Sequence, residues 1–94
     1  MKIHISAAIL AAVLGFTLGI SRMEWGLLCI TIFFVLTAES VNTALEKAVD
    51  LVTAEYHPLA RTAKNVAAGA VLLSALNAII MAFIIFGPYF FKLL

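Results

Sequence analysis

Three long apolar stretches, separated by two short polar segments, dominate the pattern of this chain. The apolar stretches cover about residues 3–20, 25–54 and 62–86, and the polar segments between them are 21-SRME-24 and 55-EYHPLAR-61. A helix rises about 1.5 Å per residue, so helices of these lengths suit the roughly 30 Å of a bilayer's hydrocarbon. Helices also satisfy their own backbone hydrogen bonds in lipid. The pattern therefore predicts an all-α, polytopic membrane protein with three transmembrane helices in one domain.

The segments between the apolar stretches predict how the helices connect. Because 21-SRME-24 is very short, helices one and two are expected to be antiparallel neighbours. Pro58 disfavours a helical conformation at His57, which predicts a break there, and Gly87-Pro88 is expected to end helix three. Lys2 before an apolar run also fits a signal peptide, but the two further spans make a retained helix the simpler interpretation.

Composition and charge narrow the classes of protein. The chain is 65% hydrophobic and 12% charged, whereas a soluble domain has about a quarter charged residues. The net charge of +1 and the lack of a basic run argue against nucleic acid as a partner. The single cysteine, Cys29, has no partner for a disulfide and is expected to be a small buried side chain.

Basic side chains are distributed unevenly between the two predicted ends of the bundle. The end that holds the N-terminus and the second connection carries Lys2, Lys47, Arg61 and Lys64. The other end carries Arg22 and Lys92, together with Trp25 and the aromatic run 89-YFF-91. The positive-inside rule then places the N-terminus in the cytoplasm, with an aromatic belt at the opposite interface.

A polar stripe follows the apolar part of helix two, in 38-AESVNTALEKAVD-50. At about 100° per residue, Asn42, Thr43, Glu46 and Asp50 fall within about 60° of Glu39. If Trp25 lies at the outer interface, Glu39 is about 21 Å further along the helix and Glu46 about 31 Å, since each residue adds about 1.5 Å. The stripe thus runs from inside the hydrocarbon to the level of the headgroups.

The stripe has a structural and a functional interpretation. Asn42 and Thr43 could simply hydrogen-bond to a neighbouring helix. A carboxylate inside the membrane, such as Glu39, is costly enough to be a functional hypothesis, and it suits a general base. Lys64, near the depth of Glu46, could reach the lipid headgroups or contact phosphate. Carboxylates for Mg²⁺, a cation for phosphate and a deeper base together predict phosphoryl transfer, without a glycine-rich phosphate loop.

The segment 39-ESVNTALEKAVDLVTAEYHPLARTAKNVAAGAV-71 closely resembles the signature region of the small prokaryotic membrane lipid kinases, the diacylglycerol kinase and undecaprenol kinase family. The shared pattern is E-x-x-N-[ST]-A-x-E-x-x-x-D, then a His, then A-K-D. It covers helices two and three and their connection. The H-P-L-A and A-A-G-A-V sequences look more like those of the undecaprenol kinases of Gram-positive bacteria than those of the diacylglycerol kinases of Gram-negative bacteria.

The resemblance implies a homotrimer in the inner membrane of a bacterial cell, with composite active sites between subunits at the cytoplasmic interface. Glu39 corresponds to the base that takes the proton of the lipid hydroxyl, with Ala68 also at the lipid substrate, and Asn42 supports the carboxylates. Glu46 corresponds to the ligand of the Mg²⁺ that bridges the ATP phosphates. The remaining residues expected around ATP are Glu55, Tyr56, His57, Lys64 and Asn65.

Two positions depart from the family pattern. Family members carry an amphipathic surface helix before the first span, with a further glutamate that shares the metal, whereas this sequence starts at 1-MKIHISAA-8. Asn65 stands where the family usually has Asp. The expected function is ATP-dependent phosphorylation of a membrane lipid alcohol, most simply undecaprenol. The alternatives are diacylglycerol as the lipid, a non-catalytic fragment, and a small proton or ion conductor, which the location of Glu39, Glu46, Asp50 and Glu55 in the cytoplasmic half disfavours.

Overall fold

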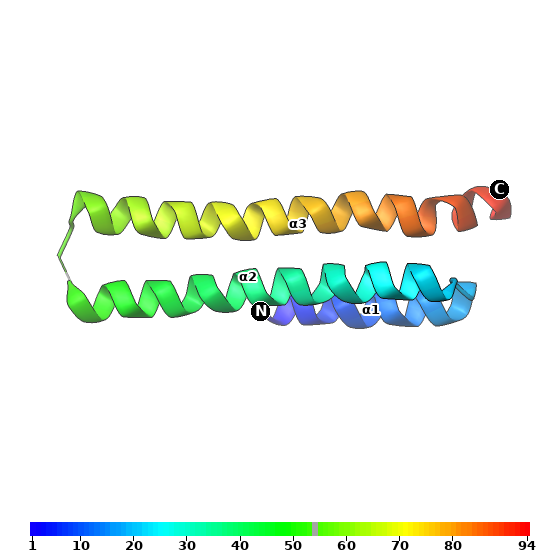
Figure 1. The fold of residues 1–94 in the computed structure, drawn as a ribbon, viewed down its shortest axis with the longest axis horizontal. Coiled ribbons are helices and arrows are strands. Elements are labelled where there is room, and N and C mark those ends of the chain that lie inside the picture. The colour runs from blue at the N-terminus through cyan, green and yellow to red at the C-terminus, as the bar shows by residue number, and fades with distance from the viewer. Residues whose placement is uncertain (54) are drawn as a thin grey trace.

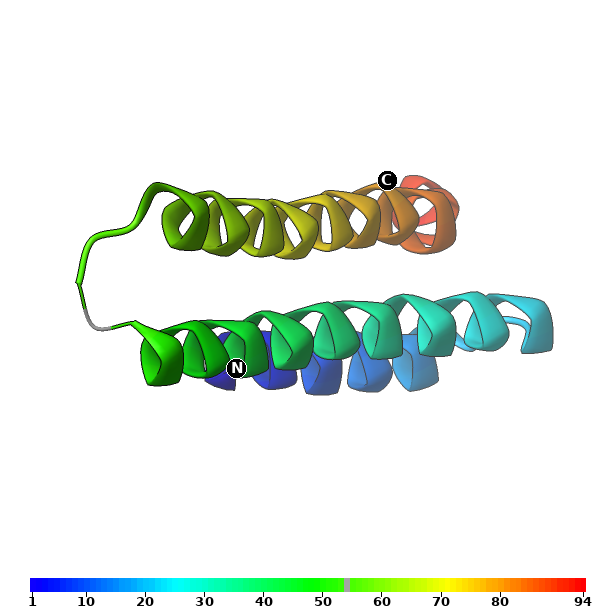
Figure 2. The same cartoon turned by 60° about the vertical axis from the view of Figure 1, so that its left-hand side comes forward.

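The computed structural model describes residues 1–53 and 55–94, and its secondary structure over them consists of helices joined by short connections. Its elements are α1 (Lys2–Leu18), α2 (Arg22–Val52) and α3 (Pro58–Leu93). Helices α2 and α3 run antiparallel along almost their whole length, and α1 folds back along the half of α2 that starts at Arg22 (Figure 1). The turned view keeps α1 against α2, on the side away from α3 (Figure 2).

Two of the three helices are long and apolar enough to cross a membrane, α2 with 31 residues and α3 with 36. Helix α1 is apolar but has 17 residues, which at about 1.5 Å per residue gives about 26 Å. Most large apolar side chains point outward, among them Ile30, Phe33 and Phe83, each more than 60% exposed. An apolar exterior of this extent suits a lipid environment, because water would not favour it.

The turn between α1 and α2 is specified by its residues. Gly19 ends α1 in the left-handed conformation (φ 66°), which glycine adopts without the steric penalty of a Cβ. Ser21 then caps α2: its Oγ accepts from the Glu24 amide at 3.2 Å, and the Glu24 carboxylate accepts from the Ser21 amide at 2.8 Å. This reciprocal capping box satisfies two amide groups that the helix itself cannot pair. The expected antiparallel hairpin is therefore fixed locally.

The buried core lies at the same end of the molecule as this turn. It is formed by Ile20, Leu28, Ile85 and Phe86. A Cβ added to Gly15 would lie 2.9 Å from the Trp25 ring, so α1 and α2 approach too closely for a larger residue at Gly15. Packing of this kind, rather than exclusion of water, holds helices together in lipid.

Helix α3 is longer at both ends than the predicted 62–86. Its start at Pro58 is favoured because proline suits the first helical position, and His57 caps it by accepting the Leu59 amide on Nδ1 at 3.1 Å. The prediction that Gly87-Pro88 ends the helix was wrong, since Pro88 lies inside α3, which continues to Leu93. A proline this close to a helix end removes one hydrogen bond without destroying the turns around it.

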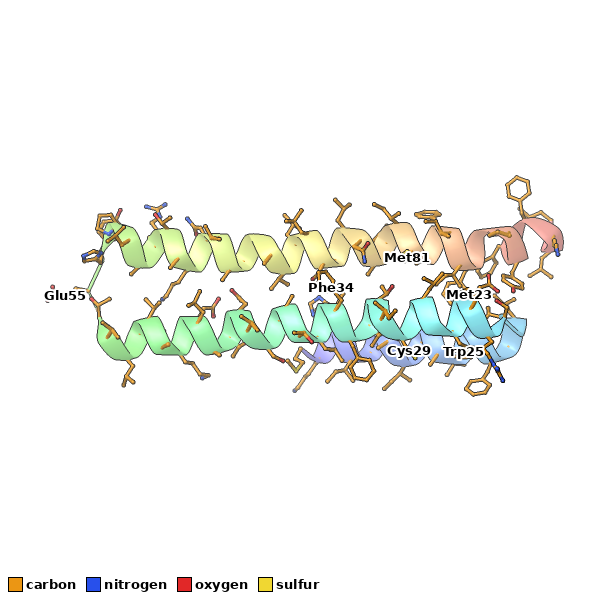
Figure 3. The ribbon with its side chains drawn as sticks, in the orientation of Figure 1. Met23, Trp25, Cys29, Phe34, Glu55 and Met81 are labelled. Atoms are coloured by element: carbon orange, nitrogen blue, oxygen red, sulfur yellow. The ribbon has the colours of Figure 1, made fainter. Side chains whose placement is uncertain are left out.

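Two further expectations differ from the structure. Helix α2 begins at Arg22 and ends at Val52, and Ala54, within the predicted 25–54, lies outside the described residues. Cys29, expected to be buried, is free and exposed on α2 (Figure 3). In a chain whose exterior is apolar, a small apolar thiol has no need to face the core.

Candidate functional site

The predicted site residues lie on the half of α2 toward Val52, in the connection that follows it, and on the start of α3. Seen along α2, three groups of polar side chains follow one another: one around Glu39, one at Asn42 and Glu46, and one at Asp50 and Lys64. Helical periodicity accounts for their common face, because residues three, four or seven apart stack along one side.

Glu39 is partly buried, with 13% of its side chain exposed, and it faces the start of α1. Its Oε2 lies 2.5 Å from His4 Nδ1, and its Oε1 lies 2.5 Å from the amino group of Met1. Sequence reasoning placed Glu39 correctly inside the helix but missed His4. The available signal was that His4, two residues after Lys2, is an ionisable side chain within an apolar stretch.

Asn42 and Glu46 are joined directly. Asn42 Nδ2 donates to Glu46 Oε1 at 3.1 Å, one helical turn away. Asn42 Oδ1 is buried and has no hydrogen-bond partner among the described residues. Carboxylate and amide oxygens are the ligands that Mg²⁺ favours, and it commonly uses one or two protein carboxylates together with substrate phosphates. Glu46 and the free oxygen of Asn42 therefore fit such an ion.

Among the described residues, protein side chains alone do not form a complete metal site. Within residues 1–53 and 55–94, no three His, Cys, Asp or Glu side chains gather as a metal site. The Glu46 position thus suits an ion that arrives with a nucleotide and completes its shell with phosphate oxygens and water. When bound, Mg²⁺ would neutralise phosphate charge at this level of α2.

The connection between α2 and α3 forms a charged pocket of about 320 Å³. Lys64 Nζ donates to Asp50 Oδ1 at 2.5 Å, which links the two helices across it. Arg61 lies over the Tyr56 ring at 6.0 Å from its centroid. The pocket brings together five of the six residues predicted around ATP, namely Glu55, Tyr56, His57, Lys64 and Asn65 (Glu55 is labelled in Figure 3). Glu46, the sixth, does not line it, whereas Asp50 and Arg61 do.

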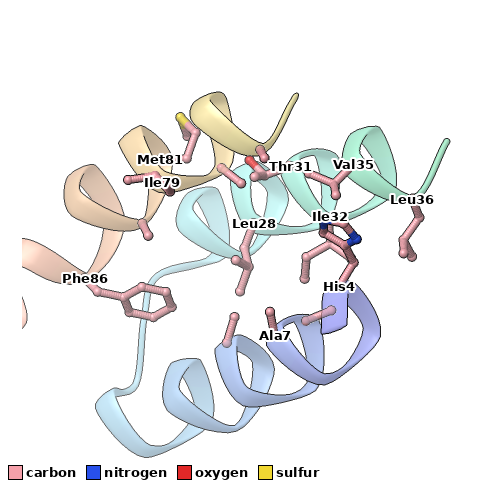
Figure 4. A pocket seen from close by; sticks show the side chains of 15 residues that line it. His4, Ala7, Leu28, Thr31, Ile32, Val35, Leu36, Ile79, Met81 and Phe86 are labelled. Carbon is pink, nitrogen blue, oxygen red and sulfur yellow. The ribbon is translucent and has the colours of Figure 1, made fainter. Parts of the chain in front are cut away.

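An apolar cavity of about 330 Å³ lies between the three helices (Figure 4). Its lining side chains are almost all aliphatic or aromatic, including Leu28, Ile32 and Phe86. His4 is the one ionisable residue of the lining, so the cavity reaches the group around Glu39 (Figure 4). A hydrocarbon chain is the kind of ligand that such a surface accepts.

Some predicted residues are not brought together within one chain. Glu39 and Asp50 are 11 positions apart, which is about 16 Å along a helix, so the pocket at Lys64 lies well beyond Glu39. Ala68 is exposed on α3 and lines neither of the two cavities. Glu39, Asn42 and Lys64 therefore form a linear series rather than one cluster.

Known proteins are similar to this chain over most of its length. An undecaprenol kinase of Bacillus subtilis (strain 168) is 39% identical over 93% of this chain and 71% of its own length. A diacylglycerol kinase of Helicobacter pylori (strain ATCC 700392 / 26695) is 37% identical over 92% of this chain and 64% of its own length. A diacylglycerol kinase of Escherichia coli (strain K12) is 32% identical over 89% of this chain and 69% of its own length.

The family described as prokaryotic diacylglycerol kinase matches residues 1–86. That match includes α1, α2 and most of α3, and with them every residue of the polar series on α2. The resemblance expected from the motifs is thereby confirmed. The chain belongs to the prokaryotic diacylglycerol kinase family of membrane lipid kinases.

Proposed function

We propose that the protein transfers the γ-phosphoryl group of ATP to the hydroxyl of undecaprenol. The observation that carries this proposal is the order of the polar groups along α2. A partly buried carboxylate, Glu39, contacts His4, which lines an apolar cavity. A charged pocket at Lys64 lies nearer the Val52 end of the helix. A lipid alcohol and a nucleotide need those two environments, one apolar and one charged.

Each group has a role in this reaction. Glu39 accepts the proton of the lipid hydroxyl as its oxygen attacks the γ-phosphorus. The new phosphorus–oxygen bond forms while the bond to the bridging oxygen of ADP breaks, and ADP leaves. Glu46 and Asn42 Oδ1 would hold the Mg²⁺ that accompanies ATP, and Lys64 would contact phosphate. Because phosphoryl transfer depends mainly on positioning and charge neutralisation, these few groups supply much of what it requires.

The remaining predicted residues are assigned to ATP and to the lipid substrate. Tyr56, His57, Glu55 and Asn65 surround ATP in the pocket at the α2–α3 connection, and Ala68 lies beside the lipid substrate on α3. Because Glu39 and Lys64 are far apart within one chain, a site completed between neighbouring subunits suits this arrangement. We therefore include a homotrimer in the proposal. Native mass spectrometry in detergent would give its mass, and a strictly monomeric active enzyme would contradict it.

Undecaprenol is preferred over diacylglycerol because of the 57-HPLA-60 and 67-AAGAV-71 sequences. Diacylglycerol is the second candidate, supported by the relatives that carry that name. The two lipids share a hydroxyl that reacts, but they differ in the hydrocarbon that follows it. The apolar cavity between the helices accommodates part of either one.

Phosphate transfer in defined vesicles tests the function. The chain, with any residues that precede Met1 in its gene, is reconstituted with Mg²⁺, ATP labelled in the γ position, and either undecaprenol or diacylglycerol. We expect labelled undecaprenyl phosphate to form faster than labelled phosphatidic acid. Faster labelling of diacylglycerol would replace the preferred lipid, and label in neither lipid would reject kinase activity altogether.

The proposed orientation has the N-terminus and the α2–α3 connection in the cytoplasm of an inner membrane. Its support is the excess of basic side chains at that end. Cys29 is the only cysteine, so Cys29→Ser provides a background for a single cysteine introduced at Thr53. A membrane-impermeant thiol reagent should label that cysteine in inside-out vesicles and not in intact spheroplasts. The reverse pattern would contradict the orientation.

A further inference from the structure

We infer that His4 is a positioning residue for Glu39, holding its carboxylate in the orientation needed to accept the lipid hydroxyl's proton. The inference rests on the proposed function, because it assigns a role to His4 in that reaction. Its starting point is the contact of 2.5 Å between His4 Nδ1 and Glu39 Oε2, which is an ion pair when the imidazole is protonated.

These two atoms depend on each other. Both are buried, and neither has another hydrogen-bond partner among residues 1–53 and 55–94. A buried polar atom without a partner is costly, so the imidazole and the carboxylate are expected to stay together. Glutamate has several rotatable bonds, and a contact at its far end restricts where the carboxylate can point.

The two oxygens of the Glu39 carboxylate also have different partners. His4 meets Oε2, whereas Oε1 faces a different donor, the amino group of Met1. Oε1 is the oxygen that we assign to the lipid hydroxyl, which would take the place of the Met1 amino group while His4 holds Oε2. The inference uses only the imidazole, which belongs to a side chain and so is present whatever precedes Met1.

The location of His4 ties this arrangement to the lipid. His4 belongs to the lining of the apolar cavity as well as to the ion pair, and its ring is seen beside Ile32 and Val35 in Figure 4. A hydrocarbon chain in the cavity would thus meet the imidazole just before its hydroxyl reaches Glu39. General bases in enzymes commonly have a third group that orients them, and His4 has that position here.

A purely structural role must be separated from this one. Residues 1–53 and 55–94 contain no other ion pair or side-chain hydrogen bond between α1 and α2 than those at Glu39. Replacing His4 could therefore loosen α1 without acting on the base. Phe16 offers a matched control, because its ring packs on Trp25 with 5.0 Å between centroids and joins the same two helices at their other end.

Two nearly isosteric variants test the role. Asn places an amide donor where Nδ1 stands, whereas Leu has the same branched shape without a donor. We expect His4→Leu to lower kcat about tenfold or more, with KM for ATP unchanged. His4→Asn should retain most of the wild-type kcat. Phe16→Ala should reduce stability and leave kcat nearly unchanged. Equal kcat for the wild type and His4→Leu would overturn the inference, as would equal losses in His4→Leu and His4→Asn.

A spectroscopic measurement tests the contact without relying on turnover. The chain has two histidines, so His57→Gln leaves His4 as the only imidazole. In ¹⁵N-histidine-labelled protein, Glu39→Gln should shift the Nδ1 resonance of His4, and Ser6→Ala, in the same part of α1, should not. An unchanged resonance would overturn the inference. If the wild type transferred no phosphate, the proposed function would be rejected. The role of His4 in that reaction would fall with it, but the contact between His4 and Glu39 would stand.

Discussion

The two ends of α2 are held in place by different kinds of contact. At the Arg22 end, the helix is capped by Ser21 and packed through Leu28 against Ile85 and Phe86, and the Tyr89 hydroxyl donates to Glu24. At the Val52 end, the contacts between elements are charged and partly exposed, as in the pair of Asp50 and Lys64. Apolar burial and capping thus dominate one end, and charge pairing dominates the other.

The difference separates stability from chemistry. Buried apolar side chains and capped amides have their full complement of partners and offer nothing to a substrate. In the proposed function, the charged groups toward the other end exchange their present partners for phosphate, a metal ion or a hydroxyl. Exposed ion pairs add little to stability, at most about 1 kcal/mol each, so exchanging them costs the fold little. Substitutions at the two ends should therefore change different measured quantities.

The largest effect is expected from Glu39→Gln, which keeps the shape of the side chain but removes its ability to take a proton. General bases contribute about a hundredfold or more to rate, so kcat should fall by at least about that factor. Thermal unfolding in detergent should change little. A variant that retains the wild-type kcat would show that the proton goes elsewhere, and it would remove the main distinction between the two ends.

A loss of stability is expected at the opposite end. Ile85 is 1% exposed, and Ile85→Ala should lower the free energy of unfolding by about 2 kcal/mol because it leaves a cavity in the core. Its neighbour Ile84 is 57% exposed and serves as the control, since Ile84→Ala removes the same atoms from a lipid-facing position. Unfolding by titration with sodium dodecyl sulfate measures both. Equal losses would mean that Ile85 is not a packed core residue.

A smaller effect on ATP binding is expected from Lys64→Gln. Loss of one charged contact to phosphate should raise KM for ATP about tenfold. The pair with Asp50 is exposed, so the free energy of unfolding should fall by about 1 kcal/mol at most. Lys47→Gln is the control, because Lys47 is exposed on α2 and forms no ion pair within the described residues. If both variants raised KM equally, general surface charge rather than Lys64 would be responsible.

The smallest effect concerns Tyr89→Phe. This change removes the hydroxyl that donates to Glu24 and leaves the ring, so the free energy of unfolding should fall by about 1 kcal/mol. The capping box of Ser21 and Glu24 remains, and kcat should be unchanged. Unfolding in detergent measures the change in the free energy of unfolding, and the vesicle assay measures kcat. A fall in kcat without a fall in stability would contradict the assignment of this end to structure alone.

Much of the fold could be predicted from the sequence because apolar stretches report directly on membrane helices. The three helices, the short connection between the first two and the break before Pro58 follow from hydropathy, length and the chemistry of proline, although that connection lies at 19–21 and not at the predicted 21–24. The common face of Glu39, Asn42 and Glu46 follows from helical periodicity, and the structure brings the amide of Asn42 to Glu46. The roles of these residues stay predictions.

Other features depend on contacts between distant segments, and local patterns do not contain them. His4 meets Glu39 only because α1 folds back beside α2 with its first turn at that level. Helix α3 passes through Pro88 because one missing amide near a helix end costs little, and Tyr89 is bonded to Glu24, 65 positions away. Cys29 faces outward because the exterior of this chain is itself apolar.

The length of α2 has a consequence for the choice of bilayer. Its 31 residues correspond to about 46 Å, well beyond the hydrocarbon thickness, while Trp25 favours the interface at one end. The distance from Trp25 to Glu39 is set by the rigid helix, whereas the distance from Trp25 to the opposite headgroups is set by the lipid. In thick bilayers Glu39 lies farther below those headgroups, and in thin ones it lies nearer to them. The fixed distance from Trp25 to Glu39 therefore makes the depth of Glu39 below the opposite headgroups depend on the lipid. The acyl chain length should change how readily the Glu39 carboxylate and a water-soluble phosphate donor reach the same depth.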